Sequence, residues 1–254
     1  MGETVRSVGV FAVLLLAACA HQQEKSRWVS SASLCAAGFE SLESGACLAV
    51  PPGAGAQTPV VMFLHGMYPE DAPAAELDIE ARLAKLAVAH GFSVLVFRGE
   101  LGLCDWSADF AHWRCWPSQA KQKAKAGELL VKLGAHFRAV SARLKLSPVR
   151  PFVMGFSNGG FFAALLAAET KLDVRGFGIL HGGPVEPAVF LAERAVPSLL
   201  ISAAGDQWQG PKMKRLHQLM EQGGWAHTYE VRAGEHQLTD ADIEQTLLFF
   251  ASHR

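Results

Sequence analysis

Residues 151–168 read PFVMGFSNGGFFAALLAA, and this stretch decides the fold. Apolar residues Phe152 to Met154 lead into Gly155-Phe156-Ser157-Asn158-Gly159, and a run of small and apolar residues follows. The pattern G-x-S-x-G between a strand and a helix is typical of a nucleophilic serine on a sharp turn. Such a turn leaves little room for side chains two residues before and after the serine, and glycines occupy both positions. We therefore predict an exposed nucleophile at Ser157; the alternative is a plain strand–helix turn.

The rest of the chain alternates short apolar runs with segments of helical periodicity. We predict a hairpin at 39–50, strands at 60–64, 92–97, 152–156, 177–180, 197–203 and 227–231, and helices at 76–90, 118–146 (with a break near Gly134), 212–222 and from about 239 onward. This alternation predicts one α/β domain over residues 34–254, with a doubly wound, mostly parallel sheet. Only residues 181–196 separate the predicted strands at 177–180 and 197–203, so we expect no large lid domain between them.

Composition excludes some classes of function. The chain has 254 residues, of which 50% are hydrophobic, and a formal net charge of −1, so we expect no nucleic-acid partner. The one regional bias is basic: between residues 114 and 150, several lysines and arginines face only Glu128. This segment is interpreted as a solvated helix face, with attraction to an anionic membrane surface as the alternative.

The N-terminal residues have the features of an export signal. Arg6 precedes an apolar run from Val8 to Leu16, which is too short to span a bilayer comfortably. The sequence Leu16-Ala17-Ala18-Cys19 resembles the lipobox of bacterial lipoproteins, in which the cysteine carries the lipid. We therefore predict a signal peptide at 1–18, lipidation of Cys19, a polar tether at 19–33, and a lipid-anchored protein of the bacterial cell envelope, facing the periplasm or the exterior. Ordinary cleavage after Ala20 is the alternative.

The remaining four cysteines then lie in an oxidising compartment, where an even number indicates disulfide bonds. Three pairings are possible, and we favour Cys35–Cys47 with Cys104–Cys115 because these close short loops. The cysteines form no paired C-x-x-C motif and have no nearby histidine cluster, so we expect no metal site.

Polar residues follow the predicted strands at their carboxyl ends, where open α/β sheets place their chemistry. Ser157, Asp206 and His236 occur in the chain order expected of a Ser-Asp-His triad on such a sheet. Asp206 directly follows the strand at 197–203, and His236 lies in the loop before the last helix. We predict these three as the catalytic residues; Glu186 and Asp173 are weaker candidates for the acid.

Four segments carry a specific resemblance: VVMFLHGM (60–67), VMGFSNGG (153–160), LLISAAGDQW (199–208) and AGEHQL (233–238). Over roughly residues 39–254 the chain resembles the α/β-hydrolase superfamily, and most of all its compact esterases related to dienelactone hydrolases, feruloyl esterases and polyhydroxyalkanoate depolymerases. The resemblance implies an oxyanion hole formed by the backbone N–H groups of Met67 and Asn158, and no cofactor.

An open cleft is expected, with Tyr68, Trp106, His181 and Trp208 as substrate-binding residues. The tryptophans between Cys104 and Cys115, and just beyond, indicate either a binding surface or a satellite hydrophobic cluster. We predict hydrolysis of carboxylic esters with a polar or aromatic acyl group, or of a polymer end. The alternatives are a serine peptidase or acyltransferase using the same triad, and a non-catalytic envelope binding protein.

Overall fold

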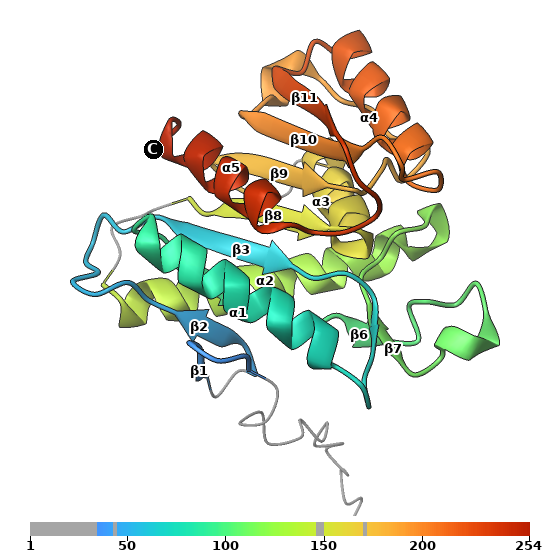
Figure 1. The fold of residues 1–254 in the computed structure, drawn as a ribbon. Helices are drawn as coiled ribbons and strands as arrows, with labels where there is room; N and C mark the ends of the chain where they lie inside the picture. Colours follow the sequence, from blue (N-terminus) through green and yellow to red (C-terminus); the bar gives the residue numbers. More distant parts are fainter. Residues whose placement is uncertain (1–34, 43–44, 146–149, 170–171) are drawn as a thin grey trace, which may run out of the picture.

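The computed structural model describes residues 35–42, 45–145, 150–169 and 172–254 (Figure 1). The predicted signal peptide (1–18), the predicted lipidation site Cys19 and the predicted tether (19–33) lie outside these ranges. Across the described residues, no helix has both the length and the apolar character needed to cross a bilayer.

One large sheet forms the centre of the molecule. Its strands, in spatial order, are β1 (Glu40–Ser41), β2 (Cys47–Ala49), β5 (Ser93–Val96), β3 (Val60–Leu64), β8 (Phe152–Phe156), β9 (Gly176–Leu180), β10 (Ser198–Ala203) and β11 (His227–Arg232). The pairs β1–β2 and β2–β5 are antiparallel, and every other pair is parallel. The predicted doubly wound, mostly parallel sheet is therefore confirmed, and so is the opening hairpin.

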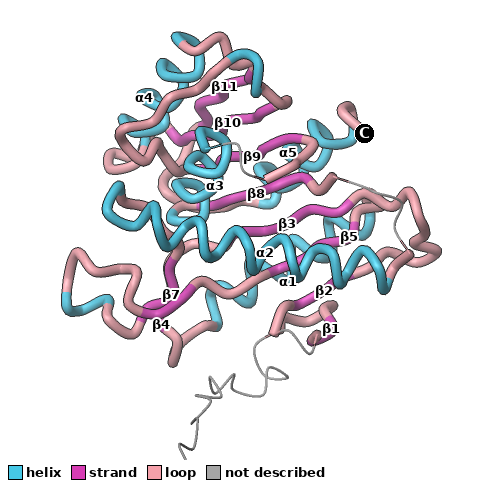
Figure 2. The backbone as a smooth tube through the Cα atoms, turned by 180° about the vertical axis from the view of Figure 1, so that it is seen from behind, coloured by secondary structure: helices cyan, strands magenta, loops and turns pink. Residues whose placement is uncertain are grey.

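Helices cover both faces of this sheet. Helices α1 (Ala74–Ala89) and α5 (Asp240–Ala251) lie on one face (Figure 1), and α2 (Lys123–Arg143), α3 (Asn158–Glu169) and α4 (Gly210–Gln222) lie on the other (Figure 2). Each helix buries an apolar stripe against the strands, and each large aliphatic side chain buried in this way contributes about 1.5–3 kcal/mol. Between β9 and β10 the structure has only the short 3₁₀ helix η4 (Ala192–Arg194), so no large lid is present there.

The start of α5 is fixed by a capping box. Thr239 Oγ1 accepts a hydrogen bond from the backbone N–H of Asp242 (3.2 Å), and Asp242 Oδ2 accepts one from the N–H of Thr239 (2.9 Å). Leu238, just before the cap, is fully buried. These contacts anchor the C-terminal end of the loop that carries His236.

Two expectations about local structure were wrong. The sequence of residues 99–117 has neither strand nor helix periodicity and so predicts a loop, but these residues contribute β6 (Glu100–Leu101), the 3₁₀ helix η2 (Ala108–Phe110) and β7 (Trp113–Cys115). Strands β6 and β7 form a small second sheet with β4 (Tyr68–Pro69). Strands of two or three residues show no periodicity in a sequence, which is why this sheet was missed. Helix α2, preceded by the 3₁₀ helix η3 (Ala120–Gln122), also continues through Gly134 without a break. A glycine costs a helix only about 1 kcal/mol, and buried Leu130, Leu133 and Val140 on either side of it hold the helix in place.

Both predicted disulfide bonds are present. Cys35 pairs with Cys47, and Cys104 pairs with Cys115, with Cα–Cα distances of 5.5 and 5.8 Å. The first bond ties the chain before β1 to β2. The second closes the segment between β6 and β7 on itself.

Most of the basic excess around α2 is balanced by carboxylates from other parts of the chain. The pairs are Lys121–Asp105, Lys123–Glu169, Lys125–Glu100, Lys132–Glu100 and Arg143–Glu40, all within 3.1 Å. Exposed pairs of this kind contribute only about 0–1 kcal/mol each. They favour the interpretation of α2 as a solvated helix face.

Candidate active site

Ser157 sits on a strained turn between β8 and α3. Its φ angle is +53°, which is uncommon for a residue with a side chain. A Cβ atom at Gly155 would lie 2.3 Å from the carbonyl oxygen of Gly159, and one at Gly159 would lie 2.0 Å from that of Leu64. The N–H of Ser157 donates to Leu180 O on the neighbouring strand (2.9 Å). The two glycines are therefore required by close backbone approach, and the turn is held from the adjacent strand.

The three residues predicted as a triad form a continuous hydrogen-bonded chain. Ser157 Oγ lies 2.8 Å from His236 Nε2, and His236 Nδ1 lies 2.6 Å from Asp206 Oδ2. The side chain of His236 is 35% exposed, whereas that of Asp206 is 1% exposed. The ring of Phe156 stacks on that of His236, with centroids 5.4 Å apart. The arrangement places one imidazole between a serine hydroxyl and a buried carboxylate.

Asp206 is held in its ionised form. Burial would raise the pKa of this carboxyl, but the backbone N–H of Gln209 (2.8 Å from Oδ1) and His236 hold the pKa below its ordinary value. An ionised Asp206 accepts a hydrogen bond from the N–H group at Nδ1 of His236. This leaves the lone pair of Nε2 directed at the Ser157 hydroxyl, as a general base requires.

A second histidine lies behind the triad. His181, at the end of β9, has a φ angle of +49°, is buried, and places Nδ1 3.6 Å from Asp206 Oδ2, beyond hydrogen-bond distance. Burial lowers its pKa, which keeps the ring neutral. Within the described ranges, His181, Asp206 and His236 are the one group whose ligand atoms could hold a metal ion, all within 4.8 Å of one another. A metal there would have to replace the short Asp206–His236 hydrogen bond, so the donor set fits a triad better than a metal site.

The segment that precedes Met67 is fixed by a buried histidine. His65 Nε2 accepts a hydrogen bond from the N–H of Gly99 (2.8 Å), and Nδ1 bonds the carbonyl oxygen of Gly66. Burial, followed by the charge of Arg98, lowers the pKa of His65 to about 3, so it stays neutral. His65 is thus structural, and it sets the course of the chain into Met67.

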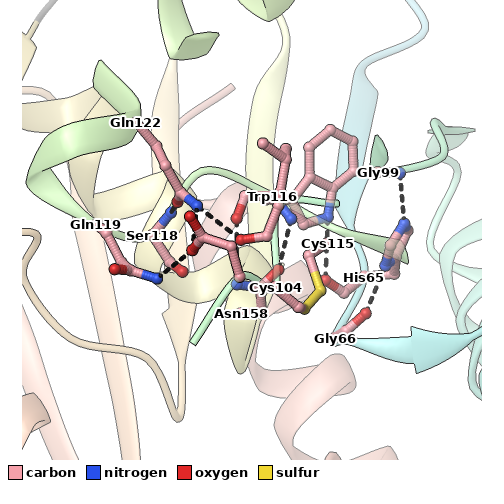
Figure 3. The surroundings of a disulfide bond; sticks show 12 residues. His65, Gly66, Gly99, Cys104, Cys115, Trp116, Ser118, Gln119, Gln122 and Asn158 are labelled. Carbon is pink, nitrogen blue, oxygen red and sulfur yellow. Dashed lines mark hydrogen bonds between the residues drawn. A yellow bond between two sulfur atoms is a disulfide. The ribbon is translucent and has the colours of Figure 1, made fainter. Parts of the chain in front are cut away.

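The residue directly after the disulfide-bonded Cys115 contacts both sides of the proposed oxyanion hole (Figure 3). Trp116, which follows Cys115, donates from Nε1 to the carbonyl oxygen of His65 (3.1 Å). Its backbone N–H donates to Asn158 Oδ1 (2.6 Å), and its carbonyl oxygen accepts from Asn158 Nδ2 (3.3 Å). The indole is fully buried and stacks on Phe162. Sequence reasoning missed this role because the contacts join residues far apart in the chain.

The tryptophans of this segment have different surroundings. Trp113 packs edge-on against Phe110, with ring centroids 5.0 Å apart, and Phe110 also contacts Trp106. Trp106 itself is 47% exposed. The segment therefore combines a satellite hydrophobic cluster with one exposed ring.

A cavity of about 400 Å³ opens over the serine. Its lining residues are Met67, Trp106, Ser118, Gln119, Ser157, Asn158, Phe161, Gln209 and Lys212. The two residues predicted to form the oxyanion hole thus lie on the same cavity as the nucleophile. Asn158 begins α3, where backbone N–H groups have no partner within the helix and the helix dipole favours negative charge.

Of the four predicted substrate-binding residues, only Trp106 lines this cavity. Tyr68 is buried, with its ring 4.7 Å from that of His65. His181 is buried behind Asp206, and Trp208 is 84% exposed and outside the lining. The expectation that these three contact substrate is not supported by their positions. Phe161, Gln209 and Lys212 were not predicted, and no motif marks them in the sequence.

Comparisons with known proteins agree with this geometry. A family described as esterase PHB depolymerase matches residues 44–206. The chain is similar in structure to a carboxylesterase from Bacillus cereus (TM-score 0.63, 18% identity, covering 86% of this chain and 96% of that one) and to a carboxylesterase from Mesorhizobium loti (TM-score 0.63, 20% identity, 84% and 99%). It is also similar to a ferulic acid esterase (TM-score 0.62, 12% identity, 82% and 92%).

These structural similarities, all below 25% identity, show the α/β-hydrolase fold. No curated protein matches the chain in sequence. The family match covers more than half of the chain and reaches from the opening hairpin to Asp206. The chain therefore belongs to the esterase PHB depolymerase family and is a serine hydrolase of carboxylic esters.

Proposed function

We propose that the chain cleaves carboxylic esters through an acyl-enzyme formed on Ser157. The observation that carries this proposal is the unbroken chain of hydrogen bonds from Ser157 Oγ through His236 to Asp206, at 2.8 and 2.6 Å. The first distance is within the reach at which a general base can take a proton from the serine, and the second lets Asp206 orient the imidazole. The serine faces a cavity that can hold a small ester.

In the first half-reaction, Ser157 Oγ attacks the ester carbonyl carbon while His236 Nε2 takes the hydroxyl proton. The carbonyl oxygen becomes an oxyanion and receives hydrogen bonds from the N–H groups of Met67 and Asn158. Loss of one such donor costs about 2.7–4 kcal/mol of transition-state stabilisation. His236 then gives its proton to the departing alcohol, and the carbonyl reforms as an ester of Ser157.

In the second half-reaction, water attacks the acyl-enzyme. His236 takes a proton from the water and returns it to Ser157 Oγ as the carboxylic acid leaves. Asp206 keeps its charge throughout and stabilises the imidazolium that forms twice per cycle.

The shape of the site supports substrates smaller or more polar than triglycerides. The chain between β9 and β10 contributes only η4, so no lid of the lipase kind covers the cavity. The lining combines an aromatic ring at Trp106 with amides at Gln119 and Gln209. An ester with a polar or aromatic acyl group, or the end of a polymer, suits such a lining.

We also propose that the protein is exported and anchored by lipid at Cys19. The support is the sequence Leu16–Cys19, together with two disulfide bonds, which persist in oxidising compartments. The wild-type protein should fractionate with membranes, and Cys19→Ser should release it to the soluble fraction. Retention of the serine variant on membranes through salt washes would contradict the anchor.

The catalytic proposal predicts that the losses of kcat caused by two single substitutions in the triad do not multiply in the double variant. Ser157→Ala and His236→Ala should each lower kcat on p-nitrophenyl esters by about 10⁴-fold or more, and the double variant should lose little further, because the triad acts as a unit. Asp206→Asn should be almost as damaging, since it favours the wrong tautomer of His236. Ser252→Ala, an exposed serine at the end of α5, is the matched control. Losses that simply multiply would refute the assigned roles.

A further inference from the structure

The cavity over Ser157 has one charged lining residue. Eight of its nine lining residues are uncharged, and the ninth is Lys212, in the first turn of α4. Hydrolysis of a neutral ester requires the triad and the oxyanion hole but no cation in the cavity lining. This charge is therefore a candidate for substrate selection.

The position of Lys212 is built into the site. Its Nζ lies 5.2 Å from the ring centroid of Phe161, at a distance typical of a cation–π contact. Phe161 is in turn one helical turn beyond the nucleophile, with its N–H donating to Ser157 O (3.1 Å). The ammonium group is thus held on the ring that adjoins the serine.

A glycine provides the space for this pair. A Cβ atom at Gly183 would lie 2.7 Å from Lys212 Cβ and 2.7 Å from Phe161 Cε1. Any side chain at this position would push the lysine stem and the aromatic ring apart. Gly183 follows β9, so the strand end and two helices together fix where the lysine begins.

The charge of Lys212 is not balanced within the described part of the chain, where no carboxylate oxygen lies within 4.0 Å of its Nζ. Arg215, a neighbouring cation on α4, is by contrast paired with a carboxylate, because its Nε lies 3.0 Å from Glu186 Oε1. Two acids bond residues of the cavity lining, and both are already engaged. Asp105 accepts a hydrogen bond from Gln119 and pairs with Lys121 at 2.6 Å, and Asp206 accepts from the N–H of Gln209 (2.8 Å) and pairs with His236 (2.6 Å). The cavity therefore presents an uncompensated positive charge to its contents.

We propose that Lys212 selects esters that carry a carboxylate at the end of the group lying along Phe161. This inference rests on the proposed ester hydrolysis and adds its substrate class. A carboxylate within reach of the ammonium would gain a charge-assisted hydrogen bond, while the apolar chain between carboxylate and ester would pack on the ring of Phe161. The carboxylate takes no part in the bonds that form and break at Ser157.

The test compares two esters of the same size and leaving group. They are p-nitrophenyl hydrogen adipate, which carries a terminal carboxylate, and p-nitrophenyl adipamate, in which a neutral carboxamide replaces it. The wild-type enzyme should favour the anionic ester by up to about fivefold in kcat/KM, because Lys212 is exposed and ion pairs of exposed side chains are weak in water. The preference should shrink between about 0.01 M and about 0.15 M salt as screening increases.

Variants assign the preference to one side chain. Lys212→Met should bring the ratio of the two kcat/KM values close to one, Lys212→Glu should invert it, and Lys212→Arg should retain it. Lys214→Met, an exposed lysine of α4 outside the cavity lining, is the matched control and should keep the wild-type ratio.

The adipamate ester also separates this inference from the proposed function. Failure of the enzyme to cleave either ester in a Ser157-dependent way would overturn ester hydrolysis itself. Cleavage of both esters with equal kcat/KM, or a wild-type preference that survives in Lys212→Met, would overturn the role of Lys212 alone. Hydrolysis of the neutral ester by each variant reports that it has folded.

Discussion

Asn158 links the nucleophile turn to the disulfide-closed segment through its side chain, so Asn158→Ala tests whether that segment supports the oxyanion hole. The substitution keeps the backbone N–H that would bind the oxyanion. It removes the two hydrogen bonds to the backbone of Trp116, at 2.6 and 3.3 Å. Any effect on catalysis must therefore pass through the position of Trp116 and of the chain it holds.

The expected magnitude follows from these two bonds. Each contributes about 0.5–1.5 kcal/mol to the free energy of unfolding, and leaving the buried N–H of Trp116 unpaired costs about 1–3 kcal/mol. We expect a total loss of about 2–4 kcal/mol, which lowers Tm by about 5–15 °C for a domain of this size. Because Trp116 also bonds the carbonyl oxygen of His65, the chain into Met67 should loosen, and kcat should fall by about tenfold.

Calorimetry and steady-state kinetics on a neutral p-nitrophenyl ester provide the two readouts. Gln119→Ala is the control for stability, since it removes an exposed amide of the same cavity, and it should change Tm by no more than about 2 °C. If Asn158→Ala shifted Tm no more than this control and kept the wild-type kcat, the bonds to Trp116 would not support the site.

Two further predictions concern stability. Replacing Cys104 and Cys115 together by serine should lower the free energy of unfolding by about 2–4 kcal/mol in a urea titration, because the bond restricts the conformations of the unfolded chain; a change below about 1 kcal/mol would contradict this. Burial, with the charge of Glu80, raises the pKa of Glu76 from 4.5 to about 8. Between pH 4.5 and 8 the folded state therefore binds more protons than the unfolded state. The free energy of unfolding consequently falls as the pH rises through this range. Glu76→Gln should therefore gain stability relative to wild type as pH rises from 5 to 8, by up to about 1.4 kcal/mol per pH unit, and parallel pH profiles would refute the raised pKa.

The central sheet could be predicted because its main strands are long enough to appear in the sequence as distinct apolar runs. Residues 60–64 and 152–156 are buried throughout, so each is a continuous apolar run bounded by turn residues. The strained turn at Ser157 was predictable for a different reason: close backbone approach demands glycine at 155 and 159, and that demand is visible in the sequence. Local steric requirements leave a local signature.

Contacts between distant residues leave no such signature. Trp116 bonds His65 and Asn158, beside the proposed oxyanion hole, through its indole N–H and its backbone. Neither spacing nor composition distinguishes it from the other tryptophans nearby. Lys212 lies in an ordinary helical segment, and only the fold brings it to Phe161 and the cavity. Tyr68, His181 and Trp208 were placed on the cleft by their positions after strands, but the sequence does not say which way a side chain faces at a strand end.

The most direct test of the central claim is covalent labelling of the nucleophile. The native protein is treated with a fluorophosphonate, and the adduct is located by mass spectrometry of the peptides. We predict a single phosphonyl group on Ser157, no labelling of Ser157→Ala, and labelling of His236→Ala that is slower by orders of magnitude. A label on another serine, or equal labelling of wild type and Ser157→Ala, would contradict the assignment of Ser157 as the catalytic nucleophile.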